Sequence, residues 1–293
     1  MPDSDHIDAA DAGTIEVGGD IVVNRFGFGA MRVTGRGVWG EPPDHDEAIA
    51  VLRRAVELGV NFIDTADSYG PEVSERLIAE ALYPYPEDLV VATKGGLIRT
   101  GPNEWPNDAR PEHLRDACEG SLRRLRLEQI PIYQLHRPDP NVPYADSVGA
   151  LVELKRAGKI AHIGVSNVDE AQLREAQSLT PVVSVQNRYN IADRQSEPLV
   201  DLCARERIAF LPWAPIRGAG EHEAVRQIAA AHGADPIQVV LAWLLIRSSA
   251  MLPIAGTGSV THLEENLGAL SVALSSEECG RLSSAHSPAD APR

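Results

Sequence analysis

The runs IYQLH (132–136), IAHIGVS (160–166) and VVSVQ (182–186) decide the fold of this chain. Each is short and mostly apolar, which is typical of a buried β-strand. Working outward from them, further runs of the same kind lie on both sides at fairly even spacing, which makes eight in all. The outer runs are FGFGA (26–30), NFIDT (61–65), LVVAT (89–93), IAFLP (208–212) and MLPIA (251–255).

Segments with a helical period separate these runs. In the first, apolar residues between Ala48 and Leu58 fall on one face, Asp44 can cap the start and Gly59 can end the helix. The segment after Pro111 has the same period. Alternating strands and helices imply parallel strands with helical crossovers. Eight such units in 293 residues predict an α/β fold, a (β/α)8 TIM barrel.

Two segments add to a minimal barrel. TIEVGGDIVV (14–23) indicates an N-terminal β-hairpin, which we expect to plug the bottom of the barrel. A helix over 235–247 is expected before the eighth strand, among extra C-terminal helices. The predicted organisation is a disordered acidic tail over 1–13, a single barrel over 14–285 and a C-terminal tail over 286–293.

Composition excludes several classes of protein. The 27 basic and 42 acidic side chains give a formal charge of −15, which disfavours nucleic acid or an anionic membrane as a partner. The 3 cysteines form no C-x-x-C pair, so a disulfide framework or cysteine metal site is not expected. The acidic start is unlike a signal peptide, and no run is long enough for a membrane helix. We therefore predict a cytoplasmic protein.

Polar or ionisable residues end most of the predicted strands. Because the carboxyl ends of barrel strands share one rim, these side chains are expected to converge there. They are Asp64, Lys94, His136, Ser166-Asn167, Gln186-Asn187, Trp213 and Gly256-Thr257.

Four of the residues near this rim could deliver a proton to an oxygen. A free phenol such as Tyr69 has a pKa of about 10, and a neighbouring ammonium such as Lys94 is expected to lower it. Asp64 can hold that ammonium charged, and His136 can hydrogen-bond a carbonyl oxygen. The set contains no nucleophile–base pair of the hydrolase kind, and no metal-ligand spacing is visible.

Each position also has a structural reading when it is taken alone. Asp64 could occupy a turn, Lys94 could be a solvated loop lysine, and His136 could be a satisfied core histidine. Tyr69 could belong to an ordinary aromatic turn, and Trp213 could fill the barrel mouth. The ordered coincidence of all these positions favours the functional reading.

The ordered motifs resemble the aldo-keto reductase superfamily over about residues 25–285. The local sequence is most similar to bacterial members that include pyridoxal reductases. The motifs are NFIDTADSYG, VATKGG, YQLHRPD, HIGVSN, VQNRYN, PWAPIRG and PIAGTGSVTHLEENL.

This resemblance implies NADPH bound across the rim without a Rossmann motif. It implies that Tyr69 is the proton donor, assisted by Lys94 and Asp64, and that His136 orients the carbonyl. The cofactor-binding residues that it implies are Ala30, Met31, Ser166, Asn167, Gln186, Trp213, Ala214, Pro215, Ile216, Gly218, Gly256, Thr257, Gly258, His262, Glu265 and Asn266.

The chain departs from the family pattern at the adenosine phosphate. Gly256 stands where many members have a lysine, and His262 where many have an arginine. Losing two cations should weaken the preference for NADPH, so use of NADH is plausible. Arg137 stands where a tryptophan is frequent; it could touch a substrate or pair with Asp139. Trp39 and Trp105 are expected to line the substrate pocket with Arg137.

The leading function is NAD(P)H-dependent reduction of an aldehyde or ketone, with pyridoxal as one candidate. The partner is then a small carbonyl compound, and the chain is a monomer or homo-oligomer. Two alternatives remain at this stage. One is a reductase-like redox-sensing binding subunit, and the other is a Schiff-base aldolase using Lys94.

Overall fold

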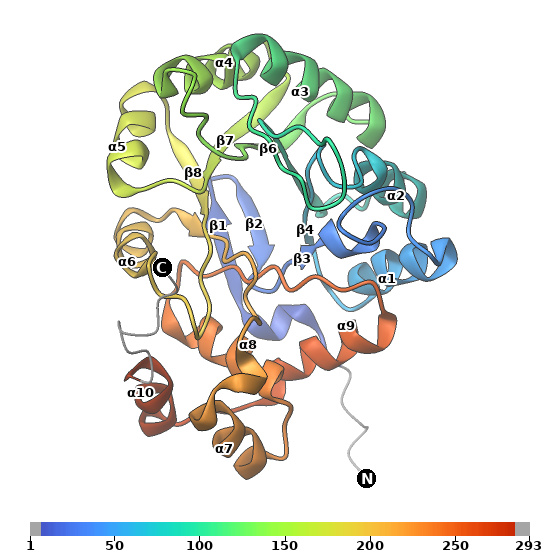
Figure 1. The fold of residues 1–293 in the computed structure, drawn as a ribbon. Helices are drawn as coiled ribbons and strands as arrows, with labels where there is room; N and C mark the ends of the chain where they lie inside the picture. Colours follow the sequence, from blue (N-terminus) through green and yellow to red (C-terminus); the bar gives the residue numbers. More distant parts are fainter. Residues whose placement is uncertain (1–6, 285–293) are drawn as a thin grey trace.

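The computed structural model describes residues 7–284 and contains a parallel sheet of seven strands in sequential order. Figure 1 shows the sheet curling inside a ring of helices. The strands are β3 (Phe28–Gly29), β4 (Phe62–Asp64), β5 (Val90–Gly95), β6 (Ile130–Leu135), β7 (Ile160–Ser166), β8 (Val182–Gln186) and β9 (Ala209–Phe210).

The segment predicted as the eighth strand closes the ring with isolated bridges. Met251 pairs in parallel with Phe210 of β9, and Ile254 pairs with Gly27 just before β3. Pro253 lies between them and has no N–H to donate, which interrupts a regular ladder. The predicted (β/α)8 barrel is therefore confirmed, with its last strand reduced to two bridges.

Helices cover the outside of the sheet, and their apolar faces pack on it. The predicted helix over 235–247 is present as α8, and α7 before it was not singled out from the sequence. The helices are α1 (His45–Glu57), α2 (Val73–Leu82), α3 (Pro111–Leu125), α4 (Tyr144–Arg156), α5 (Glu170–Leu179), α6 (Glu197–Glu206), α7 (Glu223–His232), α8 (Pro236–Arg247), α9 (Val260–Leu267) and α10 (Ser276–Ser284).

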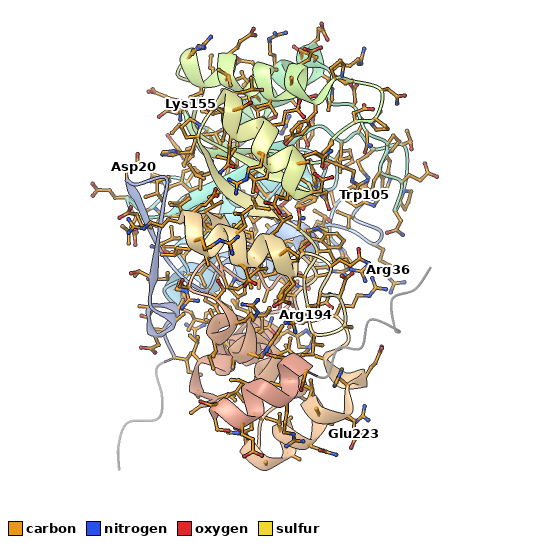
Figure 2. The ribbon with its side chains drawn as sticks, turned by 90° about the vertical axis from the view of Figure 1, so that its left-hand side faces the viewer. Asp20, Arg36, Trp105, Lys155, Arg194 and Glu223 are labelled. Carbon is orange, nitrogen blue, oxygen red and sulfur yellow. The ribbon has the colours of Figure 1, made fainter. Side chains whose placement is uncertain are left out.

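The hairpin of β1 (Thr14–Val17) and β2 (Ile21–Asn24) plugs the bottom of the barrel, as predicted. Its buried Val17 and Val23 pack in one cluster with side chains of the barrel interior. Figure 2 shows Asp20, at the hairpin turn, on the opposite side of the molecule from Trp105. The hairpin thus leaves the other end of the barrel open for a site.

Part of the predicted N-terminal tail is ordered, which corrects the expectation for 1–13. Residues Ala9–Ala12 form a 3-10 helix capped by Asp8, whose side chain accepts from the Ala10 amide. Ala9 is fully buried, and its amide donates to the Leu58 carbonyl at 2.8 Å. The cap and this buried contact hold the segment against the end of α1. Residues 1–6 and the predicted tail over 286–293 lie outside the described residues.

Apolar helices of this protein are short. Between residues 7 and 284, no single helix has the length and hydropathy needed to cross a membrane. Among these residues, α7 and α8 pass the test only when they are counted together, and the chain bends by 98° between them.

Candidate active site

The carboxyl ends of neighbouring strands bring the predicted polar residues together. Asp64 ends β4, Lys94 lies near the end of β5, and His136 directly follows β6. Ser166 and Gln186 end β7 and β8. Parallel pairing aligns these ends, and all five side chains are buried. The rim predicted from the sequence therefore exists.

Lys94 is at the centre of this rim. Its ammonium donates to Asp64 Oδ2 at 2.7 Å, to the Thr65 carbonyl at 2.8 Å and to the Tyr69 hydroxyl at 3.3 Å. Burial alone lowers the pKa of Lys94, but Asp64 and Tyr69 outweigh it, so the pKa is raised above its ordinary value. Lys94 is therefore a permanent cation beside the phenol.

The pKa of Tyr69 differs from the sequence expectation. Burial of the phenol raises its pKa, and this effect exceeds the lowering by Lys94; Asp64 adds a further rise. The expected lowering by Lys94 is present, but the net direction is upward. Tyr69 is therefore a neutral phenol that still carries its proton at neutral pH, as a proton donor requires.

His136 packs edge-on against Tyr69, with ring centroids 5.8 Å apart. Burial lowers the pKa of His136 well below its usual range, and Lys94, Arg137 and Arg99 lower it further. The imidazole is thus neutral. One ring nitrogen, Nδ1, lies 3.4 Å from the Ser68 hydroxyl. A neutral ring can donate one N–H to a carbonyl oxygen.

Two glutamines hold the other oxygen of Asp64. Gln134 and Gln186 donate to Oδ1 at 3.2 Å and 2.8 Å. Gln134 was missed in the sequence, although it lies two residues before His136 on β6 and so shares its face. The sequence reading also gave Gln186 only a role in binding the cofactor. Both amides fix the carboxylate that holds Lys94.

Ser166, Asn167 and Trp213 form one hydrogen-bonded group at the rim. Asn167 donates to the His136 carbonyl and to the Ser166 hydroxyl, each at 3.0 Å. Its Oδ1 accepts from the Trp213 indole at 3.1 Å. Ser166 donates to the Gln186 carbonyl at 2.7 Å. This network links the half-buried indole, through Asn167, to the backbone of His136.

Six other predicted cofactor residues lie in two segments. Ala30 and Met31 begin the 3-10 helix after β3, and Met31 packs with Tyr69. The segment of Ala214, Pro215, Ile216 and Gly218 follows Trp213, and Asn190 anchors it by donating to the Ala214 carbonyl at 3.1 Å.

A cavity of about 530 Å³ lies further along the rim. It gathers the last six of the predicted cofactor residues, from Gly256 to Asn266, and it adds Arg32, which was not predicted from the sequence. Its lining residues are Arg32, Ile216, Asp235, Ile237, Gln238, Gly256, Thr257, Gly258, His262, Glu265 and Asn266.

Of the predicted substrate-pocket residues, Trp105 is in ring contact with Tyr69. Its ring meets Tyr69 edge-on at 6.3 Å, and Arg99 stacks on it at 3.6 Å. Trp39 bridges to Gly70, next to Tyr69. Arg99 donates to the carbonyls of Val38 and Ser68, which precede Trp39 and Tyr69. It was not predicted from the sequence.

The suggested pairing of Arg137 with Asp139 is wrong within the described structure. Asp139 instead accepts from the Ala109 amide and from Asn141. The loop thus uses the carboxylate to satisfy its own backbone, and the charge of Arg137 instead acts on His136, whose pKa it lowers. Among residues 7–284, no group of three or more potential ligands could hold a metal ion.

A family model described as the aldo/keto reductase family matches residues 25–287. An uncharacterised oxidoreductase of Schizosaccharomyces pombe is 49% identical over 99% of this chain and 95% of its own length. Pyridoxine 4-dehydrogenase of Escherichia coli is 43% identical, over 87% of this chain and 92% of that protein. The crystal structure of a Klebsiella pneumoniae aldo/keto reductase with NADP and acetate is 27% identical with a TM-score of 0.78, covering 92% of this chain and 93% of that one.

The fold and the rim define a barrel enzyme with a buried acid–base centre, and the comparisons give its family. The chain belongs to the aldo/keto reductase family of oxidoreductases.

Proposed function

We propose that this protein is an NAD(P)H-dependent carbonyl reductase in which Tyr69 protonates the carbonyl oxygen, and that pyridoxal is a substrate. One observation carries the proposal: a buried ammonium, Lys94, lies between the Asp64 carboxylate and the Tyr69 hydroxyl. The similarity to pyridoxine 4-dehydrogenase supports the choice of substrate.

The residues of the rim would divide the work as follows. His136 donates its N–H to the carbonyl oxygen and orients it. Tyr69 gives its proton to that oxygen as negative charge develops there, and Lys94 stabilises the phenolate left behind. Asp64 keeps Lys94 charged and in place. Trp105 forms an aromatic wall beside the phenol, suited to a flat aldehyde.

The residues present fit a nicotinamide dinucleotide. When bound, it supplies the hydride. The indole of Trp213, fixed by Asn167, offers an aromatic face at the rim, and the open cavity of about 530 Å³ fits the adenosine end. Ser166, Asn167 and Gln186 would hold the nicotinamide amide, and residues 256–258 with Glu265 and Asn266 would hold the adenosine.

The test is to follow oxidation of NADPH and NADH with pyridoxal and a panel of other aldehydes. We expect turnover with pyridoxal, and a loss of about 10²- to 10⁴-fold in kcat for Tyr69→Phe because the proton donor is gone. Titration calorimetry of the variant should give an unchanged cofactor affinity.

Absence of turnover with every carbonyl, together with no effect of Tyr69→Phe, would refute the reductase. A stable protein partner with negligible turnover would instead favour the redox-sensing alternative. Turnover of other aldehydes but not pyridoxal would refute only the substrate assignment.

The Schiff-base aldolase is disfavoured by the charge of Lys94. The raised pKa of this ammonium keeps it protonated, and a protonated amine is not a nucleophile. Borohydride treatment with a carbonyl substrate should leave Lys94 unlabelled.

A further inference from the structure

Arg32 lines the cavity at the adenosine end, although it is more than 220 positions from the loop that forms the other wall. The side chain is exposed, and no described residue forms a hydrogen bond or ion pair with its guanidinium. An arginine without a partner keeps all five N–H donors free for a ligand. The guanidinium of Arg32 is therefore available to bind an anionic ligand in the cavity.

A close contact between two backbone segments brings Arg32 to this place. A Cβ on Gly256 would collide with the Gly29 carbonyl oxygen, and a Cβ on Gly258 would press on the Arg32 carbonyl. The glycines let the segment 29–32 lie directly against the loop 256–258. The contact between these two segments thus excludes a lysine at position 256 and at the same time places Arg32 beside the loop.

The charges around the cavity make this cation important. Asp235 and Glu265 line the cavity, and Glu47 accepts from the Val260 amide at the start of α9 at 2.9 Å. These three carboxylates would repel a phosphate dianion. Arg32 and His262 are the cationic types in the lining, and only the guanidinium has a planar fork of N–H donors that matches two phosphate oxygens.

We propose that Arg32 binds the 2′-phosphate of NADPH and replaces the cations missing at Gly256 and His262. It is then the residue that sets the preference for NADPH over NADH. This inference rests on the proposed function. It also changes the sequence-based expectation, because the cation lost from one loop is supplied by another.

The test compares binding of ligands that differ by one phosphate. Calorimetry measures the affinities for NADPH and NADH, and for the fragments 2′,5′-ADP and 5′-ADP. The proteins compared are the wild type, Arg32→Leu, Arg32→Gln and Arg32→Lys. We expect Arg32→Leu and Arg32→Gln to weaken NADPH and 2′,5′-ADP about tenfold or more, because a charge-assisted pair is lost. NADH and 5′-ADP should change less than about twofold, and Arg32→Lys should recover part of the loss.

Arg36→Leu is the matched control, because it removes an exposed arginine four residues away that does not line the cavity. It should leave all four affinities unchanged. Equal weakening of both members of a pair, or no weakening, would overturn the role of Arg32. If neither dinucleotide binds the wild type, the proposed function itself fails.

Discussion

The buried cluster around Lys94 and the cavity lined by Arg32 lie on the same rim but differ in how their charges are satisfied. In the first, Lys94 and Asp64 are buried and each is paired or hydrogen-bonded by neighbours. In the second, Arg32 is exposed and has no partner among the described residues. The first region is organised before any ligand binds, whereas the second keeps its charge free for one.

The largest expected effect comes from breaking the buried ion pair. Asp64→Asn leaves the Lys94 ammonium buried without its counter-ion, which should reduce the free energy of unfolding by about 3–5 kcal/mol. We expect kcat to fall by at least about 10²-fold as well. Urea unfolding and steady-state kinetics measure the two losses.

The double variant Asp64→Asn with Lys94→Met separates these losses. It removes both charges, so it should recover much of the stability while kcat stays low. A double variant no more stable than Asp64→Asn alone would contradict the view that the buried ammonium causes the instability.

A smaller effect is expected for Gln134→Leu, which removes one of the two donors to Asp64 Oδ1. Loss of a hydrogen bond to a charged group is worth about 1.5–3 kcal/mol, so we expect kcat to fall about tenfold and its pH profile to move. Cofactor affinity should not change, because Gln134 contacts Asp64 and does not line the cavity of about 530 Å³.

Gln129→Leu provides the control for this variant, since Gln129 is an exposed glutamine that donates to the Gly158 carbonyl. It should leave kcat and the pH profile as in the wild type. Equal effects of the two substitutions would show that Gln134 does not act through Asp64.

The smallest effect concerns Asp67, a buried acid in the loop between β4 and α2 whose Oδ1 has no hydrogen-bond partner. Burial raises the pKa of Asp67 well above its ordinary value, and Glu75 raises it further. The stability that this group contributes is therefore fully present below its unfolded pKa and is lost as pH rises through the folded value. Asp67→Asn should remove that dependence.

Thermal unfolding at pH 5 and pH 8 measures this difference. We expect the melting temperature of the wild type to fall more between these two pH values than that of Asp67→Asn. The exposed Asp88→Asn should behave as the wild type. If the melting temperature of Asp67→Asn falls as much as that of the wild type, the view that Asp67 is buried in its neutral form is wrong.

The sequence predicted the barrel and the gathering of polar side chains on one rim because both follow from local patterns. Short apolar runs such as IAHIGVS predict buried strands, and the carboxyl ends of parallel barrel strands lie on one rim. Asp64, Lys94 and His136 each end such a run, so their meeting followed from the topology. The hairpin over 14–23 was readable for the same reason, from its alternation and its turn.

Other features could not be predicted because they depend on balances between distant groups. The net direction of the Tyr69 pKa required the extent of its burial, which outweighs Lys94. The order in residues 9–12 required the buried contact of Ala9 with Leu58. The eighth strand was shortened where Pro253 interrupts the ladder.

By itself, the sequence determined the order of strands and helices, and thereby which polar side chains share the rim. Only the tertiary structure decided how those side chains are used. The fold places the amides of Gln134 and Gln186 in hydrogen bonds to Asp64, and it places the backbone of Arg32 against residues 256–258. The physical reason is that periodicity acts over a few residues, whereas charge pairing and backbone contact depend on distance in space.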